Sequence, residues 1–197
     1  MEISFESNIG EWTRYLGDRV AGQLPFATAK ALTDTVRLDL KPAAERLIAR
    51  RLDKPTPFTK RGIAFSGANK QGLIASVFVK DIQAEYLRVQ EEGGTTTPKG
   101  RAFLIPVGQR RNKYGNMTRN AVKAALAKPA TFSGRVKGVG GIWQRMKSGK
   151  LKLLIRYEDK TTYSPRLGFH QEMAKVAGHA FPARFARSLE HALRTAK

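Results

Sequence analysis

The 197-residue sequence contains no cysteine. This absence excludes a disulfide framework and every metal site that depends on thiolate ligands. The chain also lacks an apolar run of the roughly 18 to 20 residues that a membrane span requires. Its first residues, MEISFESNIGEW, are acidic and mixed instead of basic and then apolar, which is not typical of a secretory signal peptide. We therefore expect no contact with a membrane.

Side chains that perform acid, base or metal chemistry are scarce. The three histidines, His170, His179 and His191, all lie in the C-terminal segment and share no recognised ligand spacing. Asp81 and Glu85, four residues apart, are the best carboxylate pair for a two-metal nuclease, but a solvated helix surface explains the same pair more simply. We therefore predict a protein that is not an enzyme, with no catalytic residues, no metal and no cofactor.

Two motifs that suggest an enzyme fail in detail. Ser66 and Ser133 lack the glycine two residues earlier that a Gly-x-Ser-x-Gly nucleophile elbow requires. The run GRVKGVGG lacks the Gly-Lys-Ser/Thr ending of a phosphate-binding loop, and it is followed by Trp143 and a strand pattern instead of a helix. We interpret this run as a bendable loop that lets the backbone approach a neighbouring subunit.

Acidic residues are nearly absent from the middle of the chain. The whole sequence has 36 Lys and Arg against 16 Asp and Glu, a net charge of +20. Residues 101–160 hold 15 of the basic side chains but only Glu158 and Asp159 as acids, whereas residues 1–100 have a net charge of only +3. This segregation favours a polyanionic partner, nucleic acid above all, or an acidic face of another protein. The alternative, a basic surface that serves only solubility, does not require such segregation.

The order of hydrophobic patterns predicts an α+β fold, with N-terminal helices, a central mostly antiparallel sheet that includes a basic β-hairpin, and a C-terminal helix. The apolar content is sufficient for one sizeable core. We therefore expect residues 1–197 to form a single domain. Within it, residues 1–58 are expected to be helical, residues 59–163 mainly β and residues 164–197 helical.

Prolines interrupt the helical patterns. Ser7 and Asn8 are suited to cap a first short helix. Pro42 lies inside the next helical stripe and predicts a kink or a break there, because proline cannot donate a hydrogen bond to the carbonyl four residues earlier. In the C-terminal helix, Pro182 predicts a kink or two helices joined near Gly178.

Strand patterns occupy the centre of the chain. Residues 63–68 and 73–81 are rich in β-branched and aromatic side chains and predict two paired strands. Residues 82–92 are more helical, with Gly93 as a C-terminal cap. A further strand pattern contains Pro106, which predicts a position at the edge of a sheet.

The basic hairpin is the clearest of the strand predictions. Residues 142–146 and 151–157 are expected to pair across the turn that Lys-Ser-Gly-Lys provides. Strict alternation in the second strand would place Leu153 and Ile155 on one face and Leu154 on the other.

Basic side chains gather in the loops and the hairpin of this central region. If the loops lie at the same end of the sheet, these side chains form one cationic strip, with the aromatic rings of Tyr114 and Trp143 interleaved among them. Trp143, between Ile142 and Gln144, is expected to be a core or interface residue. No zinc finger, RNP pattern or KH loop is present, so we expect contact that is independent of nucleic-acid sequence. The predicted contact residues are Arg110, Arg111, Lys113, Arg135, Lys137, Arg145, Lys147, Lys150 and Lys152.

Three segments in this order carry a resemblance to a known family. They are the Ala-rich helical segment ATAKALTDTVRLDL, the basic middle ending in GIWQRMKSGKLKLLIRYEDK, and the aromatic and basic C-terminal segment AKVAGHAFPARFARSLEHALRTAK. Their layout resembles the minor tail protein Z family, the tail completion proteins of long-tailed bacteriophages. The resemblance spans most of the chain as an order of features.

The resemblance implies a structural protein of the virion, in its tail or neck, that is assembled in the host cytoplasm. It implies a homo-oligomeric ring around the tail axis at the head-tail junction, in contact with neighbouring tail or neck proteins and with phage DNA without sequence preference. A neck or tail protein of a short-tailed phage is one alternative. A sequence-independent nucleic-acid-binding module outside any virion is another.

Overall fold

The computed structural model describes residues 1–6 and 18–195 and has an α+β fold with antiparallel sheets and a C-terminal helix, as the sequence predicts. The helix predicted to begin at Ser7 or Asn8 lies mainly outside the described residues. The chain separates into two compact units, whereas the sequence predicts a single domain. Unit 1 comprises residues 1–91 and 166–197, and unit 2 comprises residues 92–165.

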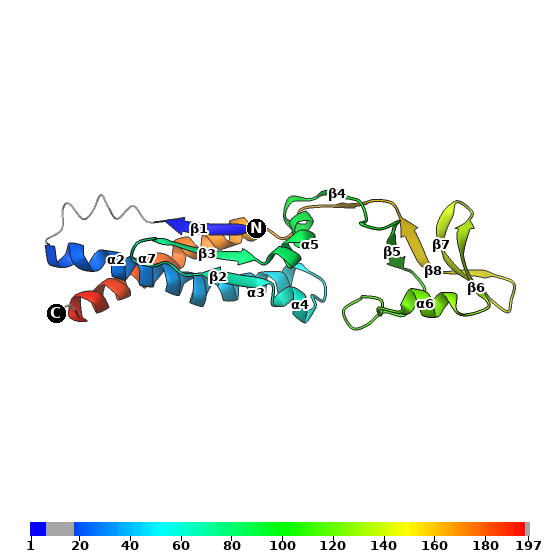
Figure 1. Ribbon diagram of the computed structural model, residues 1–197, viewed down its shortest axis with the longest axis horizontal. Coiled ribbons are helices and arrows are strands. Elements are labelled where there is room, and N and C mark those ends of the chain that lie inside the picture. The colour runs from blue at the N-terminus through cyan, green and yellow to red at the C-terminus, as the bar shows by residue number, and fades with distance from the viewer. Residues whose placement is uncertain (7–17, 196–197) are drawn as a thin grey trace. The chain divides into compact units, whose positions relative to one another are not determined.

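Unit 1 combines helices with a three-stranded antiparallel sheet of order β1-β3-β2 (Figure 1). The two predicted central strands, β2 and β3, pair with each other as expected, and both belong to unit 1. Its elements are β1 (Glu2–Glu6), α2 (Asp18–Asp34), the π-helical segment η2 (Thr35–Leu40), α3 (Lys41–Arg51), α4 (Pro57–Lys60), β2 (Ile63–Ser66), β3 (Ile74–Val79), α5 (Asp81–Glu92) and α7 (Phe169–Thr195).

The predicted irregularity at Pro42 takes the form of a π-helical segment. Pro42 is the second residue of α3, where its missing amide hydrogen has little cost. The six residues before α3 form η2, and π-helical turns are a known way for a helix to absorb such an interruption. The hydroxyl of Thr35 donates to the carbonyl of Ala31 at 2.8 Å within this stretch. The helices α2 and α3 therefore stay joined.

Helix α7 is one helix from Phe169 to Thr195, with Pro182 in its interior. Of the two predicted alternatives for this segment, a division into two helices near Gly178 is wrong. The helix packs along α2 and η2, and the guanidinium of Arg184 donates to both carboxylate oxygens of Asp39 at 2.8 and 3.0 Å. This packing supports α7 on both sides of Pro182, so the helix continues through the proline.

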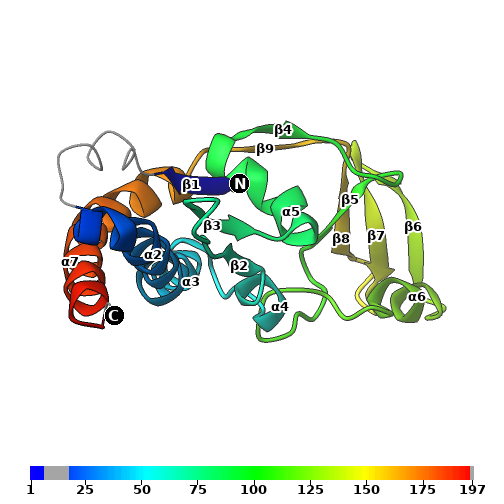
Figure 2. The same cartoon turned by 60° about the vertical axis from the view of Figure 1, so that its left-hand side comes forward.

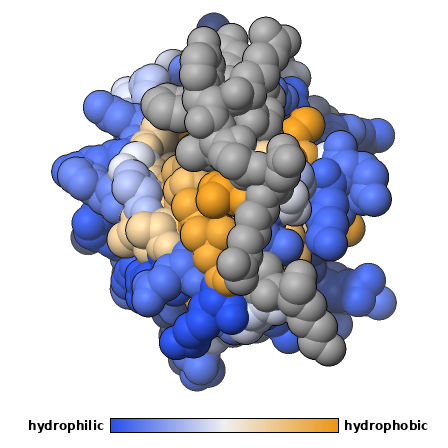
Figure 3. All heavy atoms as spheres, turned by 90° about the vertical axis from the view of Figure 1, so that its left-hand side faces the viewer, coloured by the Kyte–Doolittle hydropathy of each residue, from blue (hydrophilic) through white to orange (hydrophobic). Residues whose placement is uncertain are grey.

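The core of unit 1 lies between these helices and the sheet. Its largest side chains with almost no exposed surface are Leu32, Leu40, Leu47, Ile48, Leu87, Leu167, Phe169 and Met173. At the end of unit 1 where α2 begins and α7 ends, the described surface has an apolar area among hydrophilic residues (Figure 3).

Glu91 caps the first turn of α7. Its carboxylate accepts hydrogen bonds from the backbone amides of Phe169 at 2.7 Å and His170 at 3.1 Å, and it also lies 3.1 Å from Nδ1 of His170. Burial by itself raises the pKa of Glu91, but these hydrogen bonds together outweigh burial and lower the pKa below its ordinary value. His170 therefore has a structural partner in Glu91.

Unit 2 is built on a four-stranded antiparallel sheet of order β5-β8-β7-β6, with a separate pair formed by β4 and β9 (Figure 2). Pro106 lies in β5 at the edge of the larger sheet, as predicted. The elements of unit 2 are β4 (Gly94–Thr96), β5 (Phe103–Pro106), α6 (Ala121–Leu126), β6 (Thr131–Val136), β7 (Val139–Arg145), β8 (Leu151–Glu158) and β9 (Thr161–Tyr163).

The glycine-rich run is a hairpin and not the predicted loop. Strands β6 and β7 pair in register from Thr131 with Gln144 to Val136 with Val139. The two residues between the strands, Lys137 and Gly138, have positive φ angles of 48° and 80°. A two-residue turn with both central residues in the left-handed region is the connection whose twist matches a β-hairpin.

A β-bulge in β8 breaks the expected alternation. Ile142 pairs with Ile155, but the next residue of β7, Trp143, pairs with Leu153, so Leu154 is an extra residue on β8. Leu154 and Ile155 are therefore both buried in one cluster with α6, and the prediction that they lie on opposite faces is wrong.

Candidate nucleic-acid interface

Unit 2 contains every predicted contact residue. Its 74 residues, 92–165, carry 16 Lys and Arg against only three acidic side chains, a net charge of +13. All nine predicted contact residues have exposed side chains: Arg110, Arg111, Lys113, Arg135, Lys137, Arg145, Lys147, Lys150 and Lys152.

The sheet topology does not bring these residues together in one strip. Strand β7 runs from the β6–β7 turn at one end of the sheet to the β7–β8 turn at the other. Arg135 and Lys137 lie at the first end, while Arg145, Lys147 and Lys150 lie at the second. The predicted strip is therefore divided between two ends of the sheet.

The loop that follows β5 lies at the same end of the sheet as Arg145, Lys147 and Lys150, because it is hydrogen-bonded to the bulged residue Leu154. The carbonyl of Leu154 accepts hydrogen bonds from the amides of residues 107, 108 and 109 at 2.9, 3.1 and 3.1 Å. At Gly108, a Cβ atom would lie 2.9 Å from Cε of Lys152, so the loop passes directly against this lysine. The loop continues with Arg110 and Arg111, and the Arg111 guanidinium donates to the carbonyl of Pro106.

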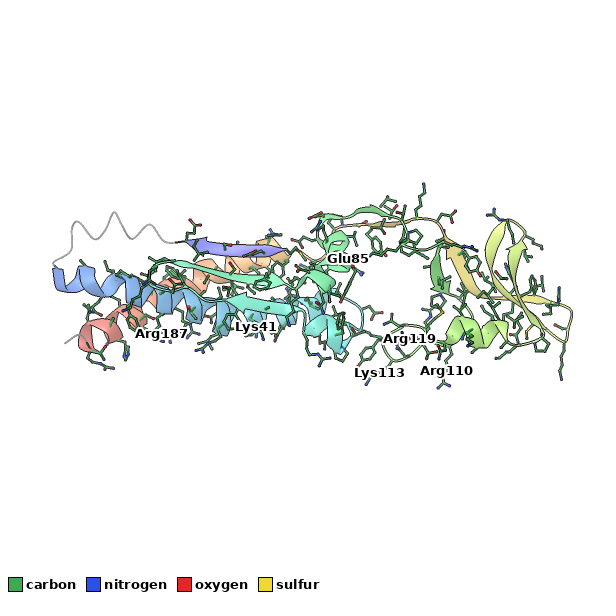
Figure 4. All side chains as sticks on the ribbon, in the orientation of Figure 1. Lys41, Glu85, Arg110, Lys113, Arg119 and Arg187 are labelled. Carbon is green, nitrogen blue, oxygen red and sulfur yellow. The ribbon has the colours of Figure 1, made fainter. Side chains whose placement is uncertain are left out.

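These contacts define a surface that we call the basic end. Figure 4 shows Arg110, Lys113 and Arg119 along the stretch between β5 and α6. Asn112 closes a turn in this stretch through its side chain, and the ammonium of Lys113 lies 5.2 Å from the ring of Tyr114. The basic end consists of Arg110, Arg111, Arg145, Lys147, Lys150 and Lys152.

Carboxylates are absent from the basic end. The three acidic residues of unit 2 are Glu92, at its beginning, and Glu158 and Asp159, at the opposite end of β8. Glu158 pairs with Arg156 at 2.5 Å. Within residues 1–6 and 18–195, none of the ion pairs involves a side chain of the basic end. Their charges are therefore available to a polyanion.

The aromatic side chains near the basic end are held by the sheet. Trp143 is half-buried beside Phe132 of β6, and its Nε1 has no hydrogen-bond partner among the described residues. The guanidinium of Arg145 lies 4.7 Å from the ring centroid of Phe132. Trp143 thus packs within the sheet, which agrees with the prediction of a core or interface residue, and Tyr114 is the ring that lies beside a lysine in a loop.

The described part of the chain contains no group of three or more His, Asp or Glu residues that could hold a metal ion. The hydroxyl of Ser133 lies 2.8 Å from that of Tyr157, and no histidine is hydrogen-bonded to it. No described helix is long and apolar enough to span a membrane.

Comparisons with protein-family models, with curated proteins and with solved structures found no match.

Proposed function

We propose that the protein is a structural component of a tailed phage virion, a tail completion or neck protein that oligomerises around the tail axis and directs its basic end toward DNA. The observation that carries this proposal is the basic end, a group of exposed Lys and Arg side chains without carboxylates, where the strands of a small sheet end. Loops and a hairpin turn present the charges, and the sheet fixes their position. Because each basic residue is exposed, one charge contributes little by itself.

A ring would make this surface effective. Rotational symmetry repeats the basic end around one axis, and many facing cations raise the potential in a central channel. Unit 2 has only four buried apolar residues in its cluster, while Ile105 and Leu151 are 38% and 42% exposed. A small unit with apolar side chains at its surface is suited to contacts with neighbouring ring proteins.

Particles that lack the protein test this proposal. We expect virions assembled without it to show free tails, empty heads or separated heads and tails by negative-stain electron microscopy, together with a loss of infectivity. Complementation with the wild-type gene should restore joined particles. Normal, infectious virions in its absence would overturn the proposal.

The same basic end also supports the alternative of a nucleic-acid-binding module outside a virion. That function predicts tight DNA binding by the isolated chain in its monomeric form. The two functions separate in a sedimentation experiment, because the tail protein is expected to bind DNA appreciably only when it is oligomeric.

A further inference from the structure

A cleft of about 860 Å³ lies in unit 2 at the end of the sheet opposite the basic end. Its floor is one row of residues across all four strands. Arg135 pairs with Gly140, and Leu104 pairs with Tyr157. Because Gly141 pairs with Arg156, Gly140 and Tyr157 are neighbours in the same row. Helix α6 packs over the buried residues nearer the basic end and leaves this row open.

The charged side chains around the cleft are only partly compensated. Arg101 and Arg135 line it, are exposed, and have no ion-pair partner among the described residues. Arg156 is already paired with Glu158, and Asp159 completes the rim. The cleft therefore offers two unpaired guanidinium groups beside two carboxylates. This combination suits a ligand that carries one phosphate and also hydrogen-bond donors.

Tyr157 supplies an aromatic surface to the cleft. Its hydroxyl is hydrogen-bonded to Ser133 at 2.8 Å, which fixes the orientation of the ring. A Cβ atom at position 140 would lie 3.7 Å from Cδ2 of Tyr157, so any larger side chain there would cover part of the ring. Glycine at this position leaves that side of the ring accessible.

We propose that this cleft binds one nucleotide of a single-stranded nucleic acid. The base stacks on Tyr157, the phosphate is held by Arg101 and Arg135, and the rim carboxylates accept hydrogen bonds from amino groups of the base. A bare polyphosphate fits less well, because the carboxylates repel it and it does not use the ring. A base paired within a duplex is stacked between its neighbours, which excludes duplex DNA from this cleft. The proposal goes beyond the proposed function, since the basic end can contact duplex DNA without it.

The test uses the full chain and a fluorescein-labelled deoxycytidine tetranucleotide, whose bases carry amino groups, with anisotropy as the measurement. The variant Gly140→Val covers the ring while its Cβ atom makes only ordinary contacts, so the fold is retained. We expect it to weaken binding about tenfold, the loss expected for one stacked base. The matched control is Gly134→Val on β6, where the Cβ atom meets Phe132 at 3.5 Å outside the cleft, and binding should be unchanged.

Two further variants identify the groups involved. Arg135→Gln should weaken binding of the tetranucleotide, and Tyr157→Phe, which keeps the ring, should retain most of it. Unchanged affinity in Gly140→Val, with loss only when Lys147 and Lys150 are replaced by alanine, would place the binding at the basic end and overturn the proposal. Equal competition by tripolyphosphate or by a glutamate-rich peptide of the same charge would also overturn it, because neither carries a base.

Discussion

The two units differ in how their charge relates to their packing. Among the described residues, the main cluster of unit 1 contains 17 buried apolar residues, and that of unit 2 contains four. Unit 1 has 20 Lys and Arg against 13 Asp and Glu, a net charge of +7, while unit 2 reaches +13 with fewer residues. The charge excess is therefore largest where the core is smallest. Since like charges oppose compaction, this excess does not serve the fold of unit 2, and a binding partner explains it better.

The units are also stabilised by different contacts. In unit 1, helices pack through large side chains and ion pairs such as that of Asp39 with Arg184. In unit 2, the backbones of the central strands approach closely at Gly141, where a Cβ atom would lie 2.3 Å from the carbonyl oxygen of Ile155. The stability of unit 2 therefore depends on glycine at position 141. In the helices of unit 1, a Cβ atom at Gly22 or Gly178 would meet no atom within 4 Å, so no such dependence is expected there.

The variant Gly141→Ala should have the largest effect on stability. The new methyl group would collide with the backbone of β8 and with the side chain of Leu153, and strand separation would cost about 1 to 3 kcal/mol or more. We expect selective loss of the unit 2 signals in a two-dimensional NMR spectrum, while those of unit 1 persist.

The partner of Gly141 in β6 provides the control. At Gly134 a Cβ atom makes only an ordinary contact with Phe132. Gly134→Ala should therefore raise the free energy of unfolding by about 0.4 to 1 kcal/mol, because alanine lowers the conformational entropy of the unfolded chain. Equal stability of the two variants would contradict the close backbone approach in unit 2.

A smaller effect is expected for Glu91→Gln in unit 1. At neutral pH the loss of the charged cap of α7 should lower the free energy of unfolding by about 1 kcal/mol. The pKa of Glu91 is lower in the folded state than its ordinary value of 4.5. The carboxylate therefore stabilises the fold fully above pH 4.5, and this contribution is lost as the pH falls through the folded-state pKa.

Urea unfolding between pH 7 and pH 3 measures this difference. The gap between wild type and Glu91→Gln should close toward the acidic end. The neighbouring Glu92→Gln is the matched control, because Glu92 is exposed and does not cap α7. A gap that stays constant over this pH range would show that the charge of Glu91 does not contribute.

The sequence allowed the helices and most strands to be predicted because their patterns are local. It did not reveal β6, because glycines in GRVKGVGG suggested a loop, although Lys137-Gly138 is a suitable hairpin turn. The strand β1 was missed for another reason: its partner β3 is about 70 residues away, and no local pattern encodes that pairing. The division into two units also depends on a long-range contact, the packing of α7 along α2, which joins residues 166–197 to unit 1.

The candidate site was predictable in composition and not in arrangement. The excess of Lys and Arg over acids is visible in the sequence, and so is the basic hairpin. The bulge at Leu154 is not, yet its carbonyl anchors the loop that brings Gly108 beside Lys152. The cleft at Tyr157 depends on one row across four strands, and the first and last members of this row, Leu104 and Tyr157, lie more than 50 residues apart in the sequence.

The measurement that tests the central claim most directly is the salt dependence of duplex DNA binding by a charge-reversal variant. Replacing Lys147, Lys150 and Lys152 by glutamate should leave the fold intact, because all three side chains are exposed. If each contacts one phosphate, the slope of log affinity against log salt should fall in magnitude by about 3, measured on the oligomeric protein.

A triple variant in unit 1, with Lys54, Lys60 and Lys80 replaced by glutamate, has the same change in net charge. The account predicts that this control keeps most of the wild-type slope and affinity, whereas the basic-end variant loses both. Equal losses in the two variants would contradict it, because DNA binding would then follow the net charge of the protein and not the basic end.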